Sequence, residues 1–91
     1  MTVTIRIPTQ LRTLTGGAGE VEVEGSTVGE ALKALDAAHA GVAERLFDAD
    51  GGIRRFVNVF LADEDVRFLQ GIDTPVTAGQ TLSIVPAVAG G

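Results

Sequence analysis

Residues 25–41, GSTVGEALKALDAAHAG, carry the clearest helical pattern of the chain and separate two regions of different periodicity. Four apolar residues of this stretch recur at i, i+3, i+4 and i+7, which places them on one face of a helix: Val28, Ala31, Leu32 and Leu35. Thr27 and Glu30 have the spacing of a capping box, and Gly41 suits a helix C-cap. The stretch therefore predicts an amphipathic helix with an apolar face to bury.

The residues before this helix alternate with a period of two. TVTIRIP (2–8) and EVEVE (20–24) both place β-branched residues on one side and polar residues on the other. Such alternation predicts half-buried strands. The glycine-rich TGGAG (15–19) between them lacks the Lys-Ser/Thr of a phosphate-binding loop, so we expect it to form the turn of a hairpin.

The residues after the helix return to strand periodicity. VAERLFDADGG (42–52) predicts a short helical turn and a loop, and RFVNVFL (55–61) predicts a strand. ADED (62–65) is a turn, VRFL (66–69) a short strand, and TLSIVP (81–86) the last strand. The order strand, strand, helix, strand, short strand, strand predicts an α+β fold, a small mixed sheet with one face covered by the helix.

The other face of that sheet must meet water or a partner. Phe60 and Val85 both point outward by the alternation of their strands, and together they would form an apolar patch on this uncovered face. Scattered exposed hydrophobic residues are normal in globular proteins, whereas a contiguous patch marks a docking surface. The sequence leaves both interpretations open.

The composition of the 91 residues excludes several classes of protein. The formal net charge is −5, whereas binders of nucleic acid or anionic membranes need clustered basic residues, so we expect neither partner. The chain has no cysteine, which excludes thiolate chemistry. No apolar run is long enough to span a bilayer and no signal-peptide pattern opens the chain, so we expect a cytoplasmic location.

No group of side chains forms a recognisable catalytic or metal-binding pattern. The acidic run Asp63–Asp65 falls in a turn between strands, where carboxylates are usually solvated, and no histidine completes a ligand set. His39, the single histidine, lies near the end of the predicted helix with no nucleophile close in sequence. We therefore expect no metal, no bound cofactor and no enzymatic activity of the chain's own.

The sequence ends VPAVAGG (85–91), and this end has two interpretations. Chain termini are often small and disordered, so the stretch can be a frayed end. Alternatively, residues 87–91 reach about 15 Å beyond the last strand at ~3.3 Å each, and glycine enters a narrow channel where a side chain would clash. The ionised carboxylate of Gly91 could then attack the α-phosphate of ATP in another protein's site.

Three segments resemble the ubiquitin-like prokaryotic sulfur carriers, the ThiS/MoaD family: IPTQLRTLTGG (7–17), RFVNVFLADEDVRF (55–68) and PAVAGG (86–91). Within this family the chain is most similar to the actinobacterial carriers of the O-phosphoserine-dependent cysteine pathway. The resemblance covers essentially the whole chain. It implies a β-grasp (ubiquitin-like) fold, with a single domain over residues 1–91 in which residues 87–91 form a flexible C-terminal tail.

The resemblance also implies a mechanism centred on that tail. An E1-like enzyme of the MoeB/ThiF type adenylates the Gly91 carboxylate with ATP and Mg²⁺. A sulfur donor converts the activated group to a thiocarboxylate, which delivers sulfide to a biosynthetic synthase. Gly90, Ala89 and Val88 enter the partner's active site, and Gly90 keeps the approach narrow. The chain is then a protein co-substrate whose reactive group is its own terminus.

The resemblance further implies how the partners bind and which ones they are. The surface that includes Phe60 and Val85 corresponds to the region with which such carriers dock on their enzymes. The sulfide acceptor is an O-phosphoserine-dependent cysteine synthase or a thiosugar synthase, and the resemblance also leaves room for a metalloprotease that releases the product. Cysteine synthesis is the first expectation, and thiosugar, thiamine and molybdopterin synthesis stay open.

Two other functions remain compatible with the residues. The chain could be a protein modifier conjugated to lysines of targets, although its own single lysine, Lys33, argues against a polymeric tag. It could also be a binding module whose sheet face docks a partner while the tail is inert. Removal of the two terminal glycines separates this last function from the others.

Overall fold

The computed structural model describes residues 2–49, 51–54 and 57–86 of the chain. In chain order the described elements are β1 (Thr2–Arg6), η1 (Thr9–Leu11), β2 (Glu20–Glu24), α1 (Val28–Ala38), α2 (Val42–Leu46), β3 (Val57–Leu61), β4 (Glu64–Asp65), η2 (Val66–Phe68), η3 (Gly71–Asp73) and β5 (Thr81–Pro86), where η marks a short 3-10 helix. The strand and helix order is the one that the periodicity predicts.

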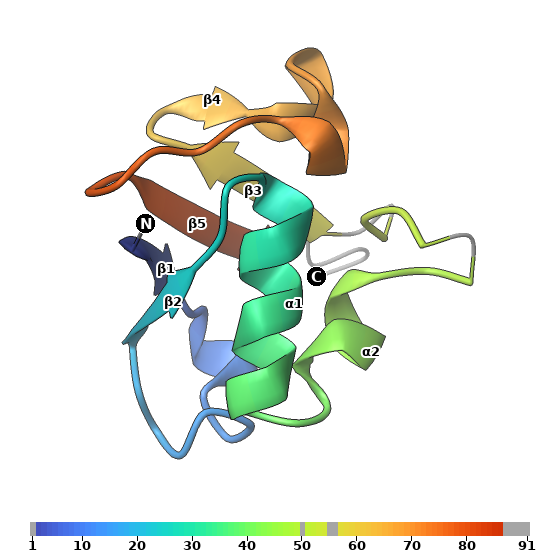
Figure 1. The fold of residues 1–91 in the computed structure, drawn as a ribbon. Helices are drawn as coiled ribbons and strands as arrows, with labels where there is room; N and C mark the ends of the chain where they lie inside the picture. Colours follow the sequence, from blue (N-terminus) through green and yellow to red (C-terminus); the bar gives the residue numbers. More distant parts are fainter. Residues whose placement is uncertain (1, 50, 55–56, 87–91) are drawn as a thin grey trace.

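The strands form one mixed sheet in the order β2-β1-β5-β3-β4 (Figure 1). β1 and β2 pair as an antiparallel hairpin, as the two alternating segments predict. β5, the last strand in sequence, lies in the centre, where it runs parallel to β1 and antiparallel to β3. The α+β fold with a small mixed sheet is therefore confirmed.

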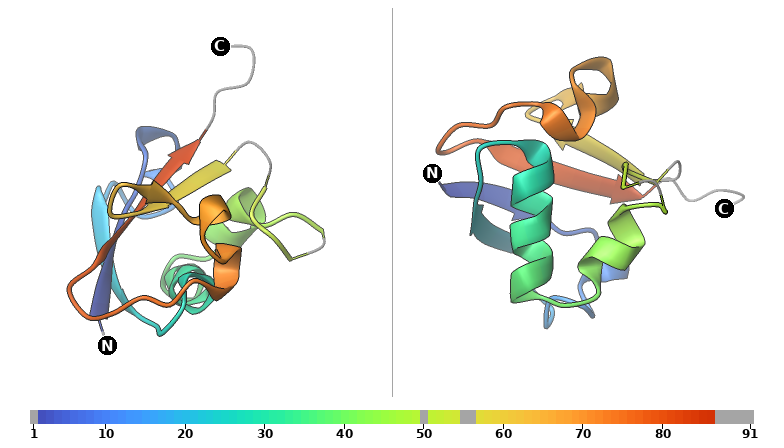
Figure 2. Two further views of the ribbon diagram at one scale, coloured as in Figure 1. Left: turned by 90° about the horizontal axis from the view of Figure 1, so that it is seen from above. Right: turned by 45° about the vertical axis from the view of Figure 1, so that its right-hand side comes forward.

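One face of this sheet is covered by α1, and among the described residues no helix covers the opposite face (Figures 1 and 2). Alternation along the strands sends one set of side chains towards α1, where burial of an aliphatic side chain contributes about 1.5–3 kcal/mol. The buried residues that the sheet and α1 contribute to this core are Val3, Ile5, Val23, Val57, Val59, Leu82, Ile84, Val28, Ala31, Leu32 and Leu35. All four residues of the predicted apolar helix face are among them.

The N-terminus of α1 has the predicted capping box with one variation. The Thr27 hydroxyl accepts a hydrogen bond from the Glu30 backbone N–H at 3.2 Å. In return the Glu30 carboxylate accepts from the backbone N–H of Ser26, at 2.9 Å, one residue earlier than in the usual motif. The cap therefore fixes both the first helical turn and the chain that leads into it.

The C-terminus of α1 differs from the sequence prediction. The helix ends at Ala38 with His39 as its C-cap, whereas we expected Gly41 in this role. Gly41 instead precedes α2 and has a φ of +102°, a backbone conformation that glycine adopts without the usual Cβ penalty. The Asp36 carboxylate accepts hydrogen bonds from the backbone N–H groups of Gly41 and Ala43, at 3.1 and 2.9 Å, so that α2 turns back beside α1. Along the described ranges, neither helix has the length and apolar character needed to cross a bilayer.

The prediction of a short strand over 66–69 is wrong. The edge strand β4 is limited to Glu64 and Asp65, and the chain then forms η2. The reason is a local cap, because the Asp65 carboxylate accepts from the Arg67 backbone N–H at 2.9 Å and turns the backbone out of the strand direction. Phe68 consequently lies on the surface, 86% exposed, instead of pairing in the sheet.

Candidate functional site

The strand that leads to the chain's C-terminal residues is held on both sides. β5 pairs with β1 through Thr4–Thr81, Ile5–Leu82 and Arg6–Ser83, and with β3 as far as Val57–Pro86. The pairing with β1 stops at Ser83, so the last residues of β5, directly before residues 87–91 in sequence, are held by β3. The predicted site residues Val88, Ala89, Gly90 and Gly91 lie outside the described residues.

Phe60 and Val85, the predicted docking residues, lie on the uncovered face of the sheet. Val85 is opposite Asn58 across β5 and β3, and Phe60 is opposite Ser83, so the two apolar side chains occupy diagonal positions on the same face. Val85 is 44% exposed and Phe60 is half-buried. The predicted face and proximity agree with this register, and the role of the pair in docking stays a prediction.

The rest of the uncovered face is polar and becomes acidic towards β2. Thr4, Thr81 and Ser83 occupy its central strands, next to the apolar pair. At the β2 edge, Arg6 and Glu20 form an exposed ion pair of 3.3 Å. The remaining outward residues of that edge strand are Glu22 and Glu24. A partner that binds near the end of β5 therefore meets apolar surface, and one that approaches β2 meets carboxylates.

Arg67, to which the sequence assigned no role, stabilises β3 next to the apolar pair formed by Phe60 and Val85. The Arg67 guanidinium donates to Asn58 Oδ1 at 2.9 Å, to the Val57 carbonyl at 2.7 Å and to the Arg54 carbonyl. Asn58 and Val57 face the last two residues of β5, so Arg67 braces β3 where it flanks the start of the tail. The assignment of 66–69 to a strand hid this role, because it left no reason for Arg67 to fold back over β3.

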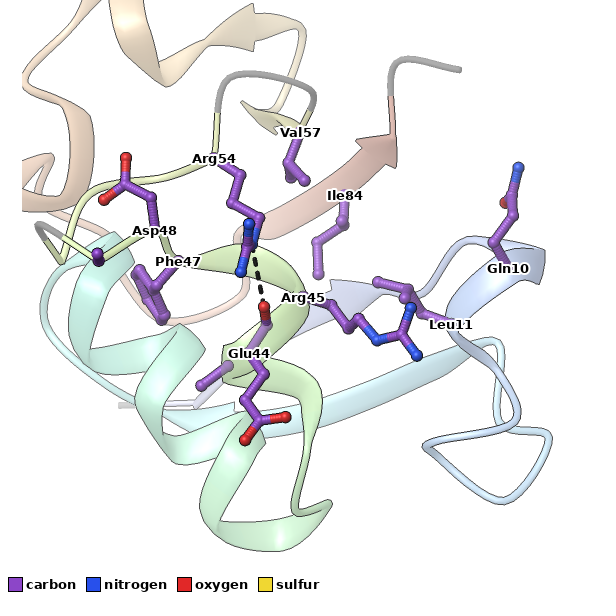
Figure 3. A pocket seen from close by; sticks show the side chains of 11 residues that line it. Gln10, Leu11, Glu44, Arg45, Phe47, Asp48, Arg54, Val57 and Ile84 are labelled. Carbon is purple, nitrogen blue, oxygen red and sulfur yellow. Dashed lines mark hydrogen bonds between the residues drawn. The ribbon is translucent and has the colours of Figure 1, made fainter. Parts of the chain in front are cut away.

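An open groove of about 970 Å³ lies on the other side of the same strand end (Figure 3). Ile84 lines it from β5 and Val57 from β3, so the groove begins beneath the last residues of the central strand. Leu11 and Phe47 add apolar surface, and the charged lining residues are Arg45, Arg54, Glu44 and Asp48. The groove residues come from four separate segments, and no spacing in the sequence indicates that they meet.

The other candidate residues have structural explanations. Asp63 lies in the turn before β4, whereas Glu64 and Asp65 form β4 itself, so the predicted turn over 62–65 is limited to 62 and 63, and Asp65 caps η2. The Thr15 hydroxyl donates within its own turn, to the carbonyl groups of Arg12 and Ala18 at 3.2 and 3.0 Å. Within the described residues, no three His, Cys, Asp or Glu side chains come together as a metal site would require.

Comparisons with known proteins agree with this arrangement. The family model of the ThiS family matches residues 5–91. The chain is 46% identical over 93 residues to the sulfur carrier protein CysO of Mycobacterium tuberculosis, with 100% of both chains covered. Its structure matches the Amycolatopsis orientalis BexX/CysO complex with a TM-score of 0.92 and 49% identity, over 98% of this chain and 99% of that chain.

A further structural match connects the fold to archaeal modifier proteins. SAMP1 of Haloferax volcanii, a small archaeal modifier protein, superposes with a TM-score of 0.84 and 29% identity, with both chains fully covered. The sheet order, the single covering helix and these superpositions confirm the predicted β-grasp (ubiquitin-like) fold. A family match over nearly the whole chain and a full-length relative at 46% identity lead to one conclusion: this protein belongs to the ThiS family.

Proposed function

We propose that this protein is a sulfur carrier whose C-terminal glycine, Gly91, is activated as an acyl-adenylate and then carries sulfur as a thiocarboxylate. The observation that carries the proposal is the full-length match to sulfur carrier proteins, in a family whose model runs through residue 91 of this chain. The fold supports it, because the central strand β5 ends at Pro86, directly before residues 87–91 in sequence, and is still paired with β3 there.

The chemistry has two steps that an activating enzyme would perform. A Gly91 carboxylate oxygen attacks the α-phosphorus of ATP and pyrophosphate leaves, with Mg²⁺ held by the enzyme and its nucleotide. A sulfide nucleophile then attacks the acyl carbon of the adenylate, AMP leaves, and a thiocarboxylate remains. The carrier supplies the acyl group and the docking surface, and the enzyme supplies the nucleotide site.

The composition of the chain suits a carrier of an activated acyl group. Acyl-adenylates react with nearby thiols and amines. The chain has no cysteine and a single lysine, Lys33, which lies exposed on α1. Self-acylation therefore has few routes, and sulfur carried on the terminal acyl group needs no cysteine in the carrier.

We infer two classes of partner from this chemistry. The first is an E1-like adenylating enzyme, and the second is a synthase that accepts the sulfide. The similarity to CysO favours cysteine synthesis as the destination, with thiosugar, thiamine and molybdopterin synthesis as alternatives. The structural relative in the BexX/CysO complex supports a protein partner for this chain as well. A metalloprotease that releases the product is a third candidate.

An intact-mass experiment tests the proposal. The protein is incubated with ATP, Mg²⁺, sulfide and an E1-like enzyme that activates an established carrier in the same assay. We expect a gain of about 16 Da, the replacement of one oxygen by sulfur at the terminus. A variant without Gly91 should keep its fold and show no gain, because the tail lies beyond the last strand. An unchanged mass of the wild type, with the established carrier converted in parallel, would refute the proposal.

The similarity to SAMP1 favours a second candidate function, a protein modifier joined through the same activated terminus to lysines of target proteins. Both functions share the adenylation step and differ in the nucleophile that follows. Peptide mapping of cell proteins for remnants of this chain's C-terminal peptide, linked through Gly91 to lysines, distinguishes them. Remnants that disappear when Gly91 is deleted would favour the modifier, whereas a thiocarboxylate without such remnants would favour the sulfur carrier.

A further inference from the structure

The groove beside α2 lies next to the end of β5. It is on the side of the sheet opposite the apolar residues Phe60 and Val85. Consecutive residues of a strand point to opposite sides of the sheet, so Val85 faces the uncovered surface while Ile84 faces the groove. An enzyme that takes up residues 87–91 must surround the point where β5 ends. Its rim therefore meets both surfaces, and on the groove side it meets Arg45 and Arg54.

The two arginines present their charge to the groove. Arg54 donates from Nε to the Glu44 carbonyl at 3.0 Å, and this hydrogen bond holds its guanidinium beside α2. No hydrogen bond or ion pair of the Arg45 side chain is found within the described ranges. Figure 3 shows both guanidinium groups along the groove, whereas the carboxylates of Glu44 and Asp48 point away from them.

We propose that this groove is a second docking site for the activating enzyme, and that it receives a segment of that enzyme with an apolar side chain flanked by a carboxylate. This inference rests on the proposed function, since it requires an enzyme that takes up the tail. The apolar side chain would contact Ile84, Val57 and Phe47, and the carboxylate would pair with Arg45 and Arg54. The acidic β2 edge would repel the same segment, so the charges also set the orientation of docking.

The charge pattern of the molecule gives this site a distinct task. The chain has a formal net charge of −5, so an acidic enzyme surface repels the carrier as a whole. A local pair of arginines at the base of the tail attracts that surface only when the carrier approaches tail first. We therefore expect the groove to act mainly on the rate of productive association, which is the part of binding that rim charges change most.

Charge reversal with a matched control tests the inference. Arg45→Glu, Arg54→Glu and the double variant are compared with Lys33→Glu, the same charge reversal on the exposed side of α1. The readout is kcat/KM for thiocarboxylate formation with the activating enzyme that converts the wild type, at low and at high salt. We expect each single arginine variant, which changes the net charge as much as Lys33→Glu does, to fall severalfold below that control at low salt, and the double variant to fall further; the gap should narrow as salt screens the charges.

Structural damage is separated from loss of docking by a milder variant. Arg54 has a backbone partner that its substitution removes, whereas Arg45→Gln removes only charge. Arg45→Gln should keep the melting temperature of the wild type and still lower kcat/KM at low salt. A double variant that reacts like Lys33→Glu at every salt concentration would overturn the inference while leaving the proposed function intact.

Two other outcomes are also informative. A faster reaction of the groove variants would mean that the groove holds the chain's own residues 87–91 in the free carrier and competes with the enzyme, which would overturn the inference as well. A wild type that no activating enzyme converts would refute the proposed function itself. The direction of the change and the behaviour of the wild type thus separate the three results.

Discussion

Arg67 and Asn58 are joined by a hydrogen bond of 2.9 Å from the guanidinium Nη1 to the side-chain Oδ1. Asn58 lies opposite Val85 in the sheet, so this contact connects η2, at the edge, to the central strand that leads to the tail. The same guanidinium binds the carbonyl group of Val57, opposite Pro86. The strand β4 pairs only with Phe60 and Leu61, so it does not reach Val57. The Arg67 guanidinium supplies the hydrogen-bond donor for the Val57 carbonyl instead.

We expect Arg67→Ala to lower the free energy of unfolding by about 1–2 kcal/mol, because the variant loses hydrogen bonds to two carbonyl groups and one amide, of which the Arg54 carbonyl keeps a second donor, the Val57 N–H. Arg67→Lys should recover only part of this loss, since an ammonium group lacks the planar fork. Urea unfolding measures the effect. Lys33→Ala, which also removes an exposed cation, should stay within about 0.5 kcal/mol of the wild type, and an equal loss in both variants would argue against a bracing role.

We expect Gly25→Ala to destabilise the protein by about 1–3 kcal/mol. A Cβ on Gly25 would lie 2.8 Å from the backbone nitrogen and 3.0 Å from the Cα of Ala31, so the start of α1 would have to move away from the end of β2. Gly52→Ala is the control, because its Cβ would meet only the Asp48 carboxylate, at 3.9 Å. Thermal unfolding should separate the two variants clearly, and similar melting temperatures would mean that the approach at Gly25 relaxes without cost.

We expect Thr27→Ala to cost about 1 kcal/mol of stability, the usual effect of losing an N-cap side chain. The hydroxyl that accepts from the Glu30 backbone N–H would be absent. This N–H, at the N-terminus of the helix, would then hydrogen-bond to water instead. Thr27→Ser keeps the hydroxyl and should unfold close to the wild type in chemical denaturation. If the serine variant lost as much stability as the alanine variant, packing of the Thr27 methyl group would be responsible instead.

The elements with a strong periodic pattern are those that the sequence predicts well. The apolar face of α1 and the alternation of β1, β3 and β5 each leave one register that buries most of the large aliphatic side chains, so the covered and uncovered faces follow from the residues alone. The placement of Phe60 and Val85 on one face is part of this result. Their diagonal placement additionally needs the pairing of β3 with β5, which the alternation does not specify.

The short and the long-range features could not be predicted in the same way. The four residues over 66–69 have too few positions to separate a strand from a 3-10 turn, and the cap from Asp65 decides between them. The groove depends on tertiary contacts. The Arg54 N–H donates to the Leu46 carbonyl at 2.7 Å, and this bond folds the segment after α2 back, which brings Arg54 beside Arg45. Such closure of a loop leaves no mark in local periodicity.

The uncovered face offers a test of docking that leaves the core untouched. Val85→Lys places a charge at the centre of the apolar pair, and Val85 is 44% exposed, so the variant should fold normally. If Phe60 and Val85 form the centre of the docking surface, the buried charge should lower kcat/KM for thiocarboxylate formation about tenfold or more, equivalent to about 1.4 kcal/mol. Glu22→Gln is the matched control, because it makes the same charge change on the same face, two strands away on β2.

The value of kcat/KM is measured for Val85→Lys and Glu22→Gln at several salt concentrations. The groove variants are measured in the same series. Loss of apolar contact should persist at high salt, whereas loss of an arginine contact should fade as the charges are screened. Val85→Lys should therefore stay impaired where Arg45→Glu recovers, because the two sides of β5 bind the enzyme through different forces. Equal activity of Val85→Lys and Glu22→Gln would exclude the uncovered face from the interface and leave the groove and the tail as the points of contact.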